Sequence, residues 1–147
     1  MQIDKVIVHC SATPSDMDIG ADVIREWHTI GNGWKDIGYH YVIRRDGSTE
    51  NGRDMDGDGN VEDEIGAHAK GFNRSSIGIC LVGGTDSDSR RDAEANYTYA
   101  QYSALVMLVQ QIKGRHGTDV EVIGHRDLNS AKACPCFDVR SLFSRIG

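Results

Sequence analysis

Two short, continuously apolar runs constrain the fold of this chain more than any other feature. They lie in Lys5–His9 and Ser76–Val82, and neither alternates between apolar and polar residues. A strand that is apolar on both faces is buried on both faces, as in a parallel sheet covered by helices. Three further strands are expected at Val120–Ile123, at Tyr39–Arg44 and, after an Asp-Gly hairpin turn, at Ser48–Asn51.

Helical spacing of apolar residues occupies the segments between these strands. Ile19–Ile30 predicts a first helix, Thr98 begins a second with Gln101 as its capping-box partner, and Asp138 caps a third. The polar segment Thr85–Asn96 is expected to be a surface loop. The side chains expected to face inward are Val23, Ile24, Trp27 and Ile30 in the first helix, Tyr102, Leu105, Val106, Val109 and Ile112 in the second, and Val139, Leu142, Phe143 and Ile146 in the third.

One domain accounts for the whole chain. Its 147 residues, 39% of them hydrophobic, are enough for one ordinary core. The interleaved elements predict a single α/β domain over residues 1–147, with a central mixed β-sheet flanked by about three helices. In such sheets ligands bind at the carboxyl ends of the strands.

The acidic charge is concentrated in one segment. The net charge is −6, from 16 basic and 22 acidic residues, and six of the acidic residues fall in Asp54–Glu64, which has no Lys or Arg. The rest of the chain is near neutral, which argues against a nucleic-acid binder. No stretch approaches the roughly 20 apolar residues of a membrane span, and the N-terminus does not resemble a signal peptide. We therefore expect a monomer made in the cytoplasm, without membrane insertion, that acts elsewhere only after release.

The four cysteines do not form an obvious disulfide framework. Cys134 and Cys136 are too close in sequence to favour pairing with each other. Cys10 and Cys80 lie in or beside apolar runs, where we expect reduced, packed thiols. Pairing of Cys10 with Cys80 stays an open alternative.

Three separated residues carry the chemistry of a zinc site. His9 ends one predicted strand, His125 stands just after another, and Cys134 lies nine positions after His125. Two imidazoles and a thiolate are good zinc ligands, and three protein ligands leave a fourth position open, as in catalytic zinc sites. The alternative is a closed, structural site in which Cys136 or Cys10 supplies a fourth ligand.

Four ordered segments surround these residues: VIVHCSAT, GWKDIGYHYVIRRDG, IGAHAKGFNRSSIGICLVGG, and GHRDL followed by KACPCFDV. Together they resemble the type 2 N-acetylmuramoyl-L-alanine amidases, a family that includes amidase-type phage lysozymes and peptidoglycan-recognition proteins. The resemblance runs from about Val6 to Val139. It implies that His9, His125 and Cys134 bind Zn²⁺.

The resemblance also places Tyr39 and Lys132 at the chemistry. We assign the Lys132 ammonium to stabilising an oxyanion, and Tyr39 to positioning water, donating a hydrogen bond or assisting proton transfer. The segment Asn129-Ser130-Ala131 is one residue longer than in some relatives, which makes the position of Lys132 less certain.

Other residues are candidates for the substrate groove. The resemblance puts His68 at its border, as a substrate contact or a neighbour of a zinc ligand, and the alternative is a structural loop residue. Asn73 and Trp34 are further candidates for substrate binding, although Trp34 is as readily explained by packing. In a strand, His40 points away from Tyr39, so we expect it to be structural.

The acidic segment near residues 54–64 resembles an incomplete calcium-binding loop and looks like an insertion. Asp54, Asp56 and Asp58 occupy positions 1, 3 and 5 of an EF-hand loop, with glycine at position 6 and Asn60 at position 7. The bidentate Glu of position 12 is missing because Ile65 stands there. Glu62, Asp63 or Glu64 would have to replace it, so a Ca²⁺ site is the expectation and a solvated acidic turn is the alternative.

The expected function is zinc-dependent hydrolysis of the amide between N-acetylmuramic acid and L-alanine in bacterial peptidoglycan. The setting implied by the resemblance is a phage or prophage endolysin that reaches the cell wall during host lysis. One alternative is a module that binds peptidoglycan without cutting it. Another is an amidase with a second role as an inhibitor of phage RNA polymerase, which no short motif can test.

Overall fold

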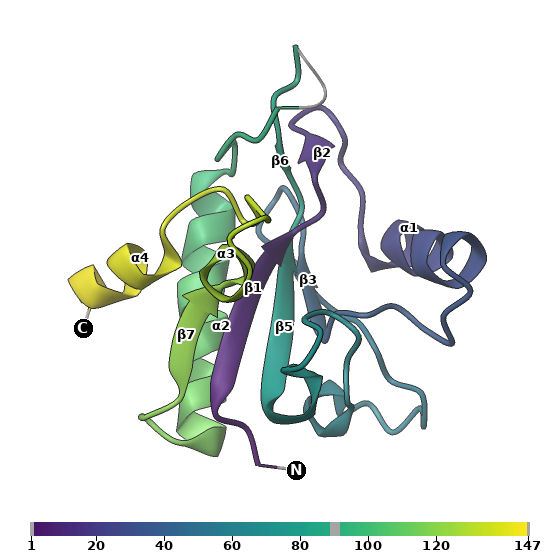
Figure 1. Ribbon diagram of the computed structural model, residues 1–147, viewed down its shortest axis with the longest axis vertical. Coiled ribbons are helices and arrows are strands. Elements are labelled where there is room, and N and C mark those ends of the chain that lie inside the picture. Colours follow the sequence, from purple (N-terminus) through teal and green to yellow (C-terminus); the bar gives the residue numbers. More distant parts are fainter. Residues whose placement is uncertain (1, 89–91, 147) are drawn as a thin grey trace.

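The computed structural model describes residues 2–88 and 92–146. Its centre is a five-stranded sheet in the order β4-β3-β5-β1-β7. The five strands are β1 (Lys5–Cys10), β3 (Tyr41–Ile43), β4 (Thr49–Asn51), β5 (Ser76–Leu81) and β7 (Glu121–Gly124). Only β3 and β4 pair antiparallel, and the other pairs are parallel. The predicted mixed sheet of a single α/β domain is confirmed (Figure 1).

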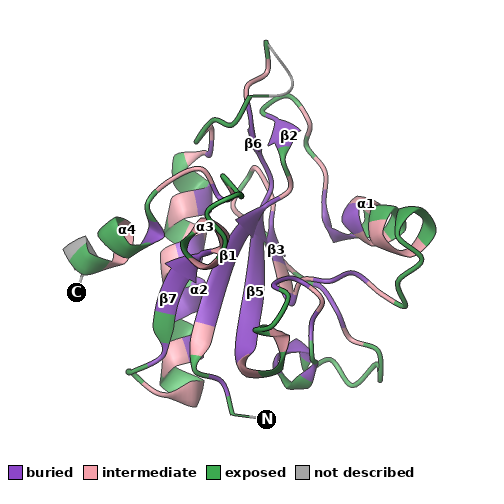
Figure 2. Cartoon of the chain, in the orientation of Figure 1, coloured by how far each residue is buried: buried purple, intermediate pink, exposed green. Residues whose placement is uncertain are grey.

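The apolar strands β1 and β5 lie in the middle of the sheet, which explains their lack of alternation. Every residue of β5 is buried, as Figure 2 shows for the centre of the molecule. Successive side chains of β1 point to opposite faces. Val6 and Val8 pack into the cluster that contains α2, whereas Ile7 packs with Ala69 on the other face. His9 follows the same alternation as Ile7, so it lies on the face opposite α2.

Helix α2 (Tyr99–His116) covers one face of the sheet. Thr98 and Gln101 form the predicted capping box, and Gly117 ends the helix with a positive φ of 127°. The expected inward residues Leu105, Val109 and Ile112 are buried, Tyr102 and Val106 are half-buried, and Leu108 joins the core as well.

The first predicted helix differs from the structure. Helix α1 covers only Ala21–Glu26, and Trp27–Gly31 forms a π-helical turn. Hydrogen bonding from i to i+5 widens that turn, so it rotates the last residues away from the face that Ile24 presents to the core. The prediction that Trp27 and Ile30 face inward is therefore wrong, since they are 42% and 77% exposed.

The remaining elements are short. The predicted surface loop is buried at its start, because Thr85 belongs to β6 (Gly84–Thr85), which pairs in parallel with β2 (Thr13–Pro14). Helix α3 (His125–Leu128) directly follows β7 and was not expected. Helix α4 (Val139–Ile146) has the predicted cap, since the Ser141 N–H donates to Asp138 Oδ1. Val139 is buried, and the side chain of Ile146 lies outside the described residues.

All four cysteines are free thiols, so Cys10 and Cys80 do not pair. His40 is structural, as expected: its buried ring accepts the Gly78 N–H at Nδ1 and donates from Nε2 to the Glu64 carbonyl oxygen. Within the described ranges, no helix has the length and apolar character needed to cross a bilayer.

Candidate active site

The sheet brings His9 and His125 together at its carboxyl edge. Strands β1 and β7 run parallel with Val8 opposite Gly124, so the residues that follow are neighbours. The centroids of the two imidazole rings lie 4.5 Å apart. Cys134 joins them from the loop after α3, where its Sγ accepts the Cys10 N–H at 2.9 Å. One potential ligand atom from each of the three residues lies within 4.8 Å of the other two.

Local contacts hold the cysteine loop against the sheet. The Arg126 N–H donates to the Cys134 carbonyl oxygen at 2.8 Å, and the Tyr97 hydroxyl donates to that of Pro135 at 2.7 Å. A Cβ added at Gly124 would lie 2.8 Å from Cδ of Pro135, so only glycine fits there without a shift of the proline. Cys134 is thereby placed by three separate segments of the chain.

The donor set of His9, His125 and Cys134 fits zinc. Burial, and then the neighbouring rings of His68, His125 and His40, lower the pKa of His9 well below its usual value, so this imidazole is neutral as a metal ligand must be. Among the described residues, Cys10 and Cys136 do not belong to this group. Three protein donors leave room for water or substrate, which favours the open catalytic site over the closed structural one.

His68 contacts His9 directly. The Ser76 hydroxyl donates to the Phe72 carbonyl oxygen at 2.7 Å and therefore accepts from His68 Nε2, 3.2 Å away. This leaves His68 Nδ1 as the acceptor for His9 Nε2, at 2.9 Å. The free lone pair of His9 is then on Nδ1, the atom available to a metal. Such hydrogen bonds fix the tautomer and orientation of metal-binding histidines.

Asn73 shapes the backbone of the loop that carries His68. Its Oδ1 accepts the backbone N–H groups of His68 and Ala69, both at 2.9 Å. The acceptor of this side chain is thus already used to shape the loop. Asn73 nevertheless lines a pocket of about 310 Å³ together with Trp34 and His68, so the three predicted substrate-binding residues share one cleft.

Tyr39 lies beside the metal-binding group. Its half-buried ring is centred 5.1 Å from that of His9. Burial, and then the thiols of Cys80, Cys134 and Cys10, raise the pKa of Tyr39 well above its usual value near 10. The phenol therefore keeps its proton and can donate a hydrogen bond.

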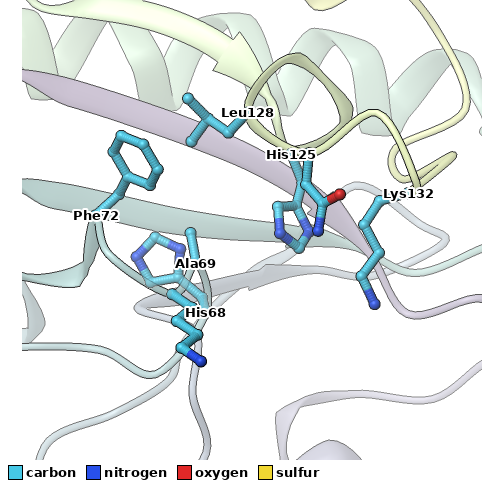
Figure 3. A pocket seen from close by; sticks show the side chains of 8 residues that line it. His68, Ala69, Phe72, His125, Leu128 and Lys132 are labelled. Carbon is cyan, nitrogen blue, oxygen red and sulfur yellow. The ribbon is translucent and has the colours of Figure 1, made fainter.

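Lys132 is exposed and lines a pocket of about 430 Å³ next to His125. In Figure 3 its side chain lies beside His125, on the other side of that ring from Phe72 and Leu128. Burial, and then the Lys132 charge, lower the pKa of His125. The pocket thus has a cationic side and an apolar side.

Sequence reasoning missed Phe72, Leu128 and His28. Phe72 and Leu128 form the apolar wall of the pocket, although both stand in segments that the family resemblance covers. His28 accepts the Gly38 N–H at Nδ1, 2.9 Å away, and its ring contacts those of Trp34 and Tyr39. A lone histidine near the end of a predicted helix gave no signal of this role.

The acidic loop is folded into a compact turn. Carboxylate oxygens of Asp54, Asp56 and Asp58 lie within 4.8 Å of one another. Gly59, at position 6 of the loop, has the positive φ of 81° that the sharp turn needs. The Asn60 side chain accepts the Glu62 N–H and caps the 3₁₀ turn Val61–Asp63, so it leaves only its backbone carbonyl for a cation.

This fold and site define a class: a single-domain α/β enzyme with an accessible His–His–Cys centre at one edge of a mixed sheet. The model of the N-acetylmuramoyl-L-alanine amidase family Amidase_2 matches residues 1–137. The endolysin of Klebsiella phage KP32 is 44% identical over 139 residues, covering 95% of this chain and 84% of that protein.

Solved structures agree with this match. The endolysin amidase LysCS from Clostridium intestinale superposes with a TM-score of 0.76 at 25% identity, covering 99% of this chain and 84% of that one. Bumblebee PGRP-SA, a peptidoglycan-recognition protein, gives 0.74 at 27% identity, covering 98% and 81%. The chain belongs to the Amidase_2 family and is an N-acetylmuramoyl-L-alanine amidase.

Proposed function

We propose that this amidase is a zinc-dependent phage endolysin that cuts peptidoglycan between the lactyl group of N-acetylmuramic acid and L-alanine. The observation that carries the zinc part is the convergence of His9, His125 and Cys134 beside an open pocket. The similarity to phage endolysins supports the substrate and the setting. In that setting the protein is made in the cytoplasm and acts on the wall after release during host lysis.

The residues around the centre divide the work of amide hydrolysis. A bound zinc ion would supply an acidified water and polarise the scissile carbonyl. Lys132 stands where an ammonium can stabilise the oxyanion that develops on that carbonyl oxygen. Tyr39, kept protonated by its surroundings, could donate a hydrogen bond beside His9. His68 holds His9, and Phe72 and Leu128 cover apolar parts of the substrate.

Mass spectrometry of defined muropeptides tests this proposal. The protein is incubated with them after dialysis against a zinc chelator, with and without added Zn²⁺, beside a Cys134→Ala variant. Release of free stem peptide that requires both zinc and Cys134 is the expected result. Undiminished release by chelated protein would overturn the zinc dependence, and binding of muropeptide without any release would indicate a recognition module.

The acidic loop is part of the proposal as a site for Ca²⁺, with Asp54, Asp56, Asp58 and the Asn60 carbonyl as ligands. Three carboxylates already converge there, and Oδ1 of Asp54 is buried without a hydrogen-bond partner within the described part of the chain. Calorimetric titration of the chelated protein with CaCl₂ tests it. Absence of binding at millimolar Ca²⁺ would rule the site out.

A further inference from the structure

Glu64 is a mostly buried residue whose carboxylate forms no hydrogen bond within the described part of the chain. Its side chain belongs to a residue that is only 7% exposed, yet within residues 2–88 and 92–146 its carboxylate forms no hydrogen bond and no ion pair. Charges in such partly enclosed positions are commonly paired or bound to a metal. One oxygen of Glu64 lies within 4.8 Å of carboxylate oxygens of Asp56 and Asp63.

Glu62 is buried to a similar extent, but its carboxylate is fully paired. It is 8% exposed, but its carboxylate accepts hydrogen bonds from Arg115, His116 and the Tyr41 hydroxyl. Glu62 therefore ties the loop to α2 and has no free oxygen to offer. Of the three acidic residues that follow the loop, only Asp63 and Glu64 remain available.

Two acidic groups meet at Asp56. Asp54, Asp56 and Asp58 form one group, and Asp56, Asp63 and Glu64 form the other. The Asp58 and Asp63 carboxyls also influence each other's pKa, so the two groups interact at a second point. Across the described chain, Lys and Arg side chains form no ion pair with any of these five carboxylates. Asp56, Asp58 and Asp63 are exposed to solvent, so a cation could reach the group from outside the protein.

We propose that Asp63 and Glu64 complete a single Ca²⁺ site with Asp54, Asp56 and Asp58, and that Glu64 replaces the glutamate missing from position 12. This inference rests on the proposed Ca²⁺ binding of the acidic loop. Ca²⁺ accepts six to eight oxygens in a flexible geometry, which this crowded, irregular set can provide, whereas Mg²⁺ demands a near-ideal octahedron. Ile65 itself cannot take the role, because its carbonyl oxygen accepts from Arg53 and its side chain is apolar.

The site is coupled to the amidase centre through the backbone that leaves Glu64. The Glu64 carbonyl oxygen accepts from His40 Nε2 at 2.7 Å, and the Ala67 N–H donates to the Gly38 carbonyl oxygen at 3.0 Å. The next residue is His68, which holds His9. A cation bound by Glu64 would therefore brace the segment 64–68, and Glu64 acts as a positioning residue for His68.

The test compares Glu64→Gln with the wild type and with Glu26→Gln, which removes an exposed carboxylate on α1. Chelated proteins resupplied with one equivalent of Zn²⁺ are titrated with CaCl₂, and MgCl₂ serves as the competing ion. Wild type and Glu26→Gln should bind one Ca²⁺ per chain, and Glu64→Gln should bind at least about tenfold more weakly. Amide hydrogen exchange in segment 64–68 should slow on Ca²⁺ addition only in the first two proteins.

The results distinguish failure of the Ca²⁺ site in the loop from failure of the role of Glu64. Absence of Ca²⁺ binding by the wild type would reject the loop site altogether. Equal affinity of Glu64→Gln would keep the loop site and overturn the role of Glu64. The metal-free melting temperature guards against misfolding: without Ca²⁺, Glu64→Gln should be at least as stable as the wild type, because it removes an unpaired charge. A lower melting temperature would mean that Glu64 serves the fold rather than a cation.

Discussion

Nδ1 of His68 lies 2.9 Å from Nε2 of His9, so the two buried imidazoles form one hydrogen-bonded pair behind the metal-binding group. The Ser76 hydroxyl holds the other end of the pair. This chain of contacts sets which nitrogen of His9 faces the centre. The role of His68 can therefore be tested by a substitution that leaves all three proposed zinc ligands in place.

Replacing His68 by Ala should weaken zinc binding and amidase activity together. Loss of such an orienting partner typically costs about 10–100-fold in metal affinity or activity. Zinc affinity is measured by competition with a chromophoric chelator, and turnover with a muropeptide. Ser76→Ala serves as a milder control, because it removes only the far end of the chain of contacts. Unchanged zinc affinity in His68→Ala would contradict the orienting role.

Gly78→Ala should disturb the same pair from the sheet side. A Cβ at Gly78 would lie 2.5 Å from Cγ of His68, so the ring or strand β5 must shift. Overpacking of this kind costs about 1–3 kcal/mol. The free energy of unfolding should fall less when Gly78→Ala is added to His68→Ala than when it is added to the wild type. Additive effects in this double-mutant cycle would show that the ring is not what Gly78 accommodates.

Lys132→Ala should lower kcat by about 10²–10³-fold, the usual effect of removing an oxyanion donor. Its side chain is exposed, so stability and zinc content should not change. Lys132→Arg keeps the positive charge and should retain part of the activity. Near-normal turnover by Lys132→Ala with zinc still bound would remove Lys132 from the chemistry.

The stability of the protein should decrease as the pH falls below about 6.5, in part through His28. Burial, and then the charge of Arg53, lower the pKa of His28 below its usual value of 6.5. A histidine with a lowered pKa contributes stability that is present above the unfolded-state pKa and is lost as the pH falls through the folded-state pKa. Protonated Nδ1 can no longer accept the Gly38 N–H.

The variant His28→Asn isolates this contribution, because its amide oxygen can accept a hydrogen bond but does not titrate. Melting temperatures are compared between pH 5 and 8. The loss on acidification should be smaller in His28→Asn than in the wild type, and His28→Ala should be less stable throughout. Parallel pH curves for wild type and His28→Asn would indicate that His28 does not titrate in this range.

Features encoded by local patterns were predictable from the sequence. The apolar runs of β1 and β5, the Thr98 capping box and the strand-end positions of His9 and His125 each follow from a few neighbouring residues. The end of the first helix was not predictable, because a π-helical turn has no pattern distinct from an α-helix in this segment.

Contacts between distant segments also lay beyond the sequence. Periodicity cannot show that His68 reaches His9 across 59 positions, or that Glu62 is taken by Arg115 while Glu64 stays free. These contacts depend on the path that the loop after β4 takes in the folded protein. The calcium-loop motif leaves Glu62, Asp63 and Glu64 as candidates for the missing ligand at position 12. Only their surroundings in the folded protein distinguish them.

The hydrogen bond from the Cys10 N–H to Cys134 Sγ joins residues 124 positions apart. Because these two residues lie so far apart in the sequence, the centre cannot form until the whole polypeptide between them has been made. The centre is therefore a product of tertiary folding, and any opening that separates the Cys134 loop from β1 would dismantle it.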